Sequence, residues 1–290
     1  MKSLCCYDNE IIKWVNKNEL YCLHIQHDDS GDNNPRWWDD HDSVMACFHP
    51  RYRLGDKIDA ITPKEFWNDL VYDMCRPGEV LDALENMKLE DTCSERYQDM
   101  ETDEYYYGLF MIDDSTGEKI SGDTIADGFN NENEMLAYVY GELSIRDCQI
   151  LLDDYIAWLP LWLHDHSGLS MDCDTRFRDM WDDGNVGWII TAIPDGSDGF
   201  KDAAERIMKD EVKTYSDYLS GENYRYTLYK DVHGEWKEID TAGGFIGGDV
   251  LRNGIAYSAG NCLESALLND ECRIGDAEKI VTVTWNFDKC

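Results

Sequence analysis

The sequence predicts an α+β fold in which mixed, mostly antiparallel sheets pack against several helices. Strand-like and helix-like segments follow one another without a regular strand–helix–strand rhythm, which argues against a doubly wound parallel sheet. The chain has 290 residues, of which 43% are hydrophobic, so it can bury a substantial core. We expect two contiguous α+β regions, residues 1–150 and 151–290. Because the boundary is weakly marked, a single domain is the alternative.

The elements of the first half follow from local patterns. Thr62 is a suitable helix N-cap, Pro63 occupies the first helical position, and the helix should stop at the RPG sequence of residues 76–78. A polar loop separates the first two strand-like stretches, and DDSTGE is a turn between two later strands. The expected strands are Leu20–Asp28, Ser43–His49 and a pair within 101–122, and the other expected helices are 79–87 and 131–155.

The second half contains the clearest helix, which runs from Phe200 to Leu219 and has Gly221 just beyond its end. Turn formers at Asp183–Asn185 should precede a strand, and the GGFIGG sequence of residues 243–248 predicts a close backbone approach or bulge between strands. A short helix is expected around Cys262–Leu268. The expected strands of this half are 156–168, 187–193, 224–231, 236–240 and 279–287.

Charge is the outlying property of the composition. Sixty Asp and Glu against 26 Lys and Arg give a formal net charge of −34. A folded chain of this length is about 50 Å across, and duplex DNA carries about one charge per 1.7 Å of axis. The charge per unit length is therefore comparable with that of DNA. Because such charge destabilises a compact fold and exceeds what solubility requires, we expect a surface that basic partners bind. A merely solvated acidic surface is the alternative.

The densest acidic segment is 99–134, where eleven acidic residues accompany one base, Lys119. Carboxylates that imitate phosphates should come from such a segment, because a nearby lysine would neutralise the pattern. Tyrosines are interleaved with these acids and would add contact area at an interface. The predicted partner-binding residues are Asp99, Glu101, Asp103, Glu104, Asp113, Asp114, Glu118, Asp123 and Asp127.

Cysteine usage and hydropathy predict a cytoplasmic protein. The eleven cysteines are scattered without a C-x-x-C pair, which is typical of reduced thiols rather than a disulfide framework or zinc ribbon. No apolar run reaches the length of a signal peptide or a membrane span. The negative charge would also repel nucleic acid and anionic membranes, so neither is an expected direct ligand.

The sequence LHDHSGLSMDC suggests an active site at first. His164 and His166 would lie on one face of a strand, and Cys173 or Asp172 could be a third zinc ligand. However, no second ligand pair occurs at a recognisable spacing, and Ser167 lacks a nucleophile elbow. No EF-hand loop or phosphate loop is complete. We therefore expect no catalytic residue, metal or cofactor. A metal-dependent enzyme centred on His164, His166 and Cys173 remains the alternative.

Three blocks of the sequence carry a resemblance. They are NNPRWWDDHDSVMACFHPRYRLGD from Asn33 to Asp56, the pair LHDHSGLSM and WDDGNVGWI, and the pair YLSGENYRYTLYKD and GGFIGG. In this order they resemble a group of acidic proteins of similar length encoded by phages and other mobile elements. The resemblance implies a phage-like origin and assigns no catalytic residue.

Origin and charge together predict a non-enzymatic anti-defence inhibitor. Its partner would be a host defence protein or nuclease, such as a restriction or CRISPR complex, whose basic groove follows the nucleic-acid backbone. An acidic surface could occupy that groove in place of DNA. A homo-oligomeric inhibitor that binds its target outside the groove is a further alternative, in which the charge would be incidental.

Overall fold

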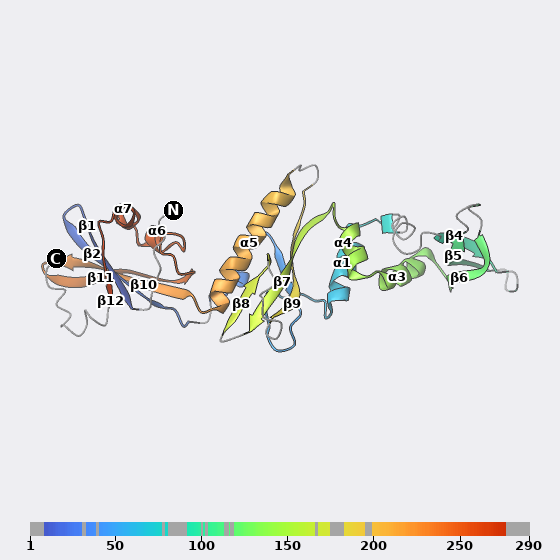
Figure 1. The fold of residues 1–290 in the computed structure, drawn as a ribbon, viewed down its shortest axis with the longest axis horizontal. Coiled ribbons are helices and arrows are strands. Elements are labelled where there is room, and N and C mark those ends of the chain that lie inside the picture. The colour runs from blue at the N-terminus through green and yellow to red at the C-terminus, as the bar shows by residue number, and fades with distance from the viewer. Residues whose placement is uncertain are drawn as a thin grey trace. The chain divides into compact units, whose positions relative to one another are not determined.

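The protein has the predicted α+β fold, with helices and mostly antiparallel strands in three sheets (Figure 1). The computed structural model describes residues 9–30, 33–38, 41–76, 79–80, 92–99, 101, 104–112, 116, 119–165, 168–174, 183–194 and 199–276. Two compact units are discontinuous in the sequence. Unit 1 comprises 1–42, 160–186 and 206–290, and unit 2 comprises 43–159 and 187–205. The sequence had suggested a contiguous boundary near residue 150.

Unit 1 contains an antiparallel five-stranded sheet that combines strands from the beginning of the chain with strands from its last third. β2 pairs with β1, its neighbour in the sequence, and with β10, some two hundred residues later. In spatial order the strands are β11 (Glu235–Ile246), β10 (Asn223–Val232), β2 (Glu19–His27), β1 (Glu10–Asn16) and β12 (Arg273–Asp276).

The core of this sheet lies against two short helices, α6 (Ile255–Ala259) and α7 (Leu263–Leu268). Trp14 and Tyr226 are almost fully buried there among aliphatic side chains. The Trp14 indole N–H donates to the carbonyl oxygen of Asn261 at 2.8 Å, so the polar end of this large side chain has a partner.

A second sheet has the strand order β3 (Val44–Cys47), β9 (Asp183–Ala192), β7 (Ile156–Asp165) and β8 (Leu169–Asp172). In unit 1, a hydrogen bond joins β8 to α5 (Phe200–Leu219), because the backbone N–H of Met171 donates to the Ser216 hydroxyl at 2.9 Å. A one-turn helix, Pro35–Trp37, is also joined to α5, in this case by an ion pair. The Arg36 guanidinium lies 2.6 Å from the Glu211 carboxylate, and the two side chains are 2% and 16% exposed.

In the described part of unit 2, the helices α1, α3 and α4 pack around a core rich in aromatic side chains. Trp67 is fully buried in α1, and its ring meets Trp158 and Trp188 edge-on at 5.8 and 5.5 Å between centroids. Figure 1 shows α3 between the α1–α4 pair and the three-stranded sheet of this unit, and α3 contacts both β5 and β6. The elements are α1 (Pro63–Met74), α3 (Glu132–Glu142), α4 (Ile145–Leu151), β4 (Thr92–Gln98), β5 (Tyr105–Ile112) and β6 (Lys119–Phe129).

Several local predictions are confirmed. The Thr62 hydroxyl accepts from the Glu65 backbone N–H and caps α1. α5 has the predicted bounds. The glycine-rich sequence forms the predicted bulge: the β10–β11 register shifts between Tyr224 and Tyr226, where the two residues Gly243 and Gly244 lie opposite the single residue Arg225.

Two local predictions are wrong. Residues 131–155 do not form one helix, because Ser144 begins a new one with a capping box, in which Ser144 and Asp147 satisfy each other's backbone N–H groups. Residues Asp183–Asn185 are not a turn but the start of β9. Most of the expected helix at 79–87 and the whole expected strand at 279–287 lie outside the described residues.

Candidate functional site

The predicted partner-binding residues that the structure describes lie on and beside the β4–β5–β6 sheet. Four of them have described side chains: Glu101, Glu104 and Asp127 are exposed, and Asp99 is half-buried. Asp123 lies in β6, but its side chain is not among those described. The remaining predicted residues, Asp103, Asp113, Asp114 and Glu118, lie outside the described part of the chain.

Strand register sorts the side chains of this sheet onto two faces. Tyr97 is paired with Tyr106 across β4 and β5, and their rings lie 6.3 Å apart. The ring of Phe110 also meets Tyr97 edge-on at 5.5 Å, so these three rings share one face. The opposite face carries Leu109, which is 2% exposed and belongs to the core of unit 2. The Tyr97 face is therefore turned away from the core.

Carboxylates surround this outward aromatic face and are held by hydrogen bonds. The Tyr106 hydroxyl donates to the Glu104 carboxylate at 2.6 Å, and the Tyr97 hydroxyl lies near enough to the Asp127 carboxylate to feel its charge. At the β4–β5 turn, the Asp99 carboxylate accepts from the Glu101 backbone N–H at 2.8 Å. We call this surface the tyrosine–carboxylate face and define it as Tyr97, Asp99, Glu101, Glu104, Tyr106 and Asp127.

Electrostatic interactions on this face keep the Tyr97 hydroxyl protonated, so that it can act as a hydrogen-bond donor. Burial, followed by the negative charge of Asp127, raises the pKa of the Tyr97 hydroxyl above its usual value. The hydroxyl therefore stays protonated at neutral pH and can donate to the Asp127 carboxylate. Carboxylates that are held in place lose little conformational freedom when they bind a cationic partner.

A glycine makes this packing feasible. A Cβ atom added to Gly108 would lie 2.8 Å from the Phe110 ring and 3.1 Å from the Asp127 Cβ. The bare backbone thus allows the ring and the carboxylate-bearing strand to approach each other closely. Sequence reasoning identified the acids of this site and interleaved tyrosines, but the pairing of each tyrosine with a carboxylate depends on the register.

The alternative centre at His164, His166 and Cys173 gains no support from the described residues. His166 and Ser167 lie outside them. His164 is paired with Ser170 in the β7–β8 ladder, whereas Cys173 follows β8 and is buried. Burial, together with Asp174 and Asp172, raises the pKa of the Cys173 thiol to about 12, which disfavours the thiolate that zinc requires. Among the described residues, no three His, Cys, Asp or Glu side chains form a group able to hold a metal ion.

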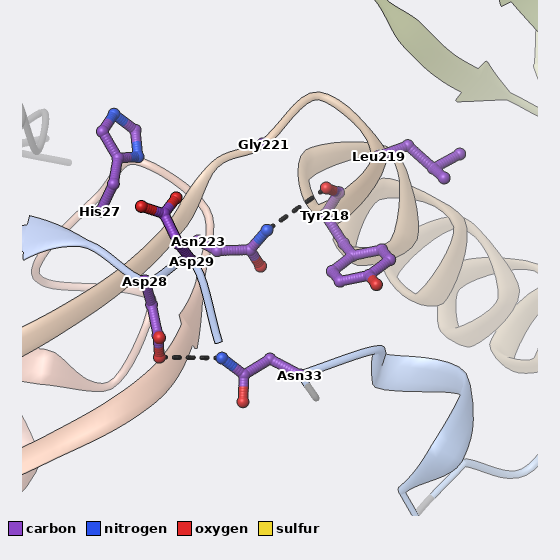
Figure 2. Close-up of a pocket in the computed structure, with 8 residues that line it drawn as sticks. All are labelled: His27, Asp28, Asp29, Asn33, Tyr218, Leu219, Gly221 and Asn223. Atoms are coloured by element: carbon purple, nitrogen blue, oxygen red, sulfur yellow. Dashed lines mark hydrogen bonds between the residues drawn. The ribbon is translucent and has the colours of Figure 1, made fainter. Parts of the chain in front are cut away.

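Sequence reasoning did not single out a pocket at the C-terminal end of α5, which is lined by His27, Asp28, Asn33, Tyr218 and Asn223, among others (Figure 2). The Asp28 carboxylate accepts from the backbone N–H of Gly244 at 3.0 Å, across 216 positions of the chain. No local signal could reveal this contact, since each residue belongs to an ordinary loop or bulge.

Within the described part of the chain, no helix has the length and apolarity needed to cross a membrane. Comparisons with family models, with curated proteins and with solved structures find no match.

Proposed function

We propose that this protein is a non-enzymatic inhibitor that binds the basic, nucleic-acid-binding surface of a host defence nuclease in the cytoplasm. The observation that carries the proposal is the tyrosine–carboxylate face, where carboxylates lie beside tyrosine rings and the exposed Glu104 carboxylate accepts from the Tyr106 hydroxyl. A groove that binds DNA presents lysine and arginine to phosphates. Carboxylates at fixed positions can engage the same cations, and tyrosines contribute buried contact area.

The charge of the whole chain supports the same proposal. A net charge of −34 attracts a basic partner over several ångströms and accelerates encounter, while the face supplies short-range contacts. The choice of a defence nuclease as the partner comes from the resemblance to phage-encoded acidic proteins. Inhibition then requires only occupancy of the groove, without any chemical step.

A charge-reversal variant with a matched control tests this proposal. The first variant changes the four described acids of the face to lysine: Asp99→Lys, Glu101→Lys, Glu104→Lys and Asp127→Lys. The control changes four exposed acids of unit 1 and alters the net charge equally: Glu235→Lys, Glu238→Lys, Glu264→Lys and Glu271→Lys. Native protein should capture a nuclease from bacterial host lysate and inhibit its cleavage of duplex DNA.

The two variants should differ although their net charges are equal. Each exposed charge contributes at most about 1 kcal/mol, so four reversals at the interface should weaken binding by several kcal/mol, or about a thousandfold. The control should retain most of its inhibition at about 0.15 M salt, and native binding should fall steeply by about 0.5 M. Equal inhibition by both variants, or capture unaffected by salt, would contradict the proposal.

A further inference from the structure

The pocket at the C-terminal end of α5 is formed entirely by residues of unit 1 and has a volume of about 350 Å³. Figure 2 shows Tyr218 on one side, Asp28 and Asn33 on another, and Asn223 between them. The Tyr218 ring stacks on Tyr215 with 6.1 Å between centroids, which fixes an aromatic wall. The pocket shares no residue with the tyrosine–carboxylate face, and the proposed function assigns it no role.

Asp28 is a fixed negative charge in this pocket. One of its carboxylate oxygens accepts from the Asn33 amide at 2.8 Å and from the Gly244 backbone N–H at 3.0 Å. Burial alone would raise its pKa, but the hydrogen bonds from Ser30, Gly244 and Asn33 lower it below its usual value. The close approach needs glycine, since a Cβ added to Gly243 would lie 2.4 Å from the same oxygen.

Asn223 contributes an acceptor whose orientation is fixed. Its amide nitrogen donates to the Tyr218 carbonyl oxygen at 3.4 Å. Because a carbonyl can only accept, the amide oxygen must point the other way, as Figure 2 shows. That oxygen is buried and has no hydrogen-bond partner among the described residues. A buried acceptor without a donor is unfavourable, so this oxygen favours an N–H or O–H donor, brought by a buried water or by a ligand of the pocket.

The remaining lining adds negative charge. Asp29 is exposed, and the described residues that line the pocket include no lysine or arginine. The C-terminal end of α5, which has 20 residues, also carries the negative end of the helix dipole. The pocket therefore combines acceptors, two carboxylates and an aromatic wall, and a ligand for it must be a cation that donates hydrogen bonds.

We propose that this pocket binds a guanidinium group, supplied by an arginine side chain of the protein's basic partner. A guanidinium is planar, presents five N–H donors and stacks on aromatic rings, so it matches carboxylates, a lone amide oxygen and the Tyr218 ring together. The volume admits the group and its alkyl stem. A calcium ion would need six to eight oxygen ligands, and the described residues form no such cluster. Only the source of the arginine rests on the proposed function; the pocket's affinity for guanidinium does not.

Nuclear magnetic resonance of the full ¹⁵N-labelled chain tests the pocket directly. The probe is N-acetyl-arginine amide, and the readout is the side-chain amide signal of Asn223. We expect a saturable shift with the arginine amide, at least several-fold weaker binding of N-acetyl-lysine amide, and no shift with calcium. The variant Asp29→Asn should weaken arginine binding by about tenfold, as expected for one charge-assisted hydrogen bond. Asp210→Asn, on the exposed surface of the same helix and outside this pocket, should leave it unchanged.

The outcomes separate this inference from the proposed function. Absence of a saturable shift, equal binding of the lysine amide, a calcium-dependent shift, or equal effects of Asp29→Asn and Asp210→Asn would each overturn the arginine site. None of these results depends on the partner. If the pocket binds the arginine amide but Asp29→Asn leaves the affinity for the captured nuclease unchanged, the partner is not the source of the arginine.

Discussion

The ion pair between Arg36 and Glu211 provides a prediction with a definite energetic pattern. The Arg36 side chain is 2% exposed, the Glu211 side chain is 16% exposed, and 2.6 Å separates their charged atoms. The other carboxylate oxygen of Glu211 accepts from the Asp42 backbone N–H at 3.2 Å. Replacing Glu211 by leucine would leave the more deeply buried charge without its carboxylate.

The magnitude follows from the two exposures. Removing one partner of a buried pair costs about 3–5 kcal/mol when the remaining charge cannot reach water. Glu211→Leu should fall in that range, because Arg36 is almost completely buried. Arg36→Met should cost less, about 1–2 kcal/mol, because the Glu211 carboxylate retains some contact with solvent. The double variant should lie within about 1 kcal/mol of the native protein, since an apolar pair of similar volume can replace a buried ion pair.

Urea-induced unfolding of the native chain and the three variants at pH 7 measures these differences as a double-mutant cycle. Circular dichroism reports the helix content, and indole fluorescence reports the aromatic environment. A coupling energy near zero, in which the double variant costs the sum of the single variants, would refute the reasoning. A cost below about 1 kcal/mol for Glu211→Leu would refute it as well, because the pair would then contribute no more than an exposed one.

Three further predictions address packing, capping and thiol chemistry. Gly187→Ala should lower the free energy of unfolding by about 3 kcal/mol or more, because the added Cβ would lie 1.8 Å from a backbone oxygen of β3. Gly184→Ala is the control: its Cβ would lie in open space, so urea titrations should show a change of less than about 1 kcal/mol. Ser144→Ala should cost about 1 kcal/mol in the same assay, since it removes the side-chain cap of α4. Burial raises the pKa of the Cys148 thiol to about 12, so its thiolate fraction at pH 8 is about one in ten thousand and rises tenfold per pH unit. Mass spectrometry should therefore show that iodoacetamide modifies the exposed Cys262 well before Cys148.

Elements with strong local signals could be predicted from the sequence. α5 has a helical apolar stripe and a terminal glycine, and α1 has a capping threonine followed by proline, so both were located closely. β4 was missed because it is mostly polar and lacks alternation, and β8 was missed because it has only four residues. β1 was missed although its first residues are buried, because Glu10–Ile12 forms a continuous buried run rather than an alternating one.

The functional surfaces were predictable only in part. Acidic residues and tyrosines are visible as composition, but register decides which of them share a face, and register depends on pairing between strands. The pocket at the C-terminal end of α5 had no sequence signal. It depends on Asp28 meeting Gly244 and on an amide whose orientation is set by the Tyr218 carbonyl. Contacts between residues so distant in the chain follow from topology rather than from local pattern.

The arrangement of unit 1 has a consequence for synthesis on the ribosome. β1 and β2 emerge early as a hairpin, but β10 and β12, which complete the sheet on either side, emerge about 200 residues later. At 5–20 residues per second, the hairpin waits roughly 10–40 s with both edges open. Open edges invite pairing between neighbouring nascent chains. A strongly negative chain repels its copies during that interval, which disfavours such pairing while the sheet is incomplete.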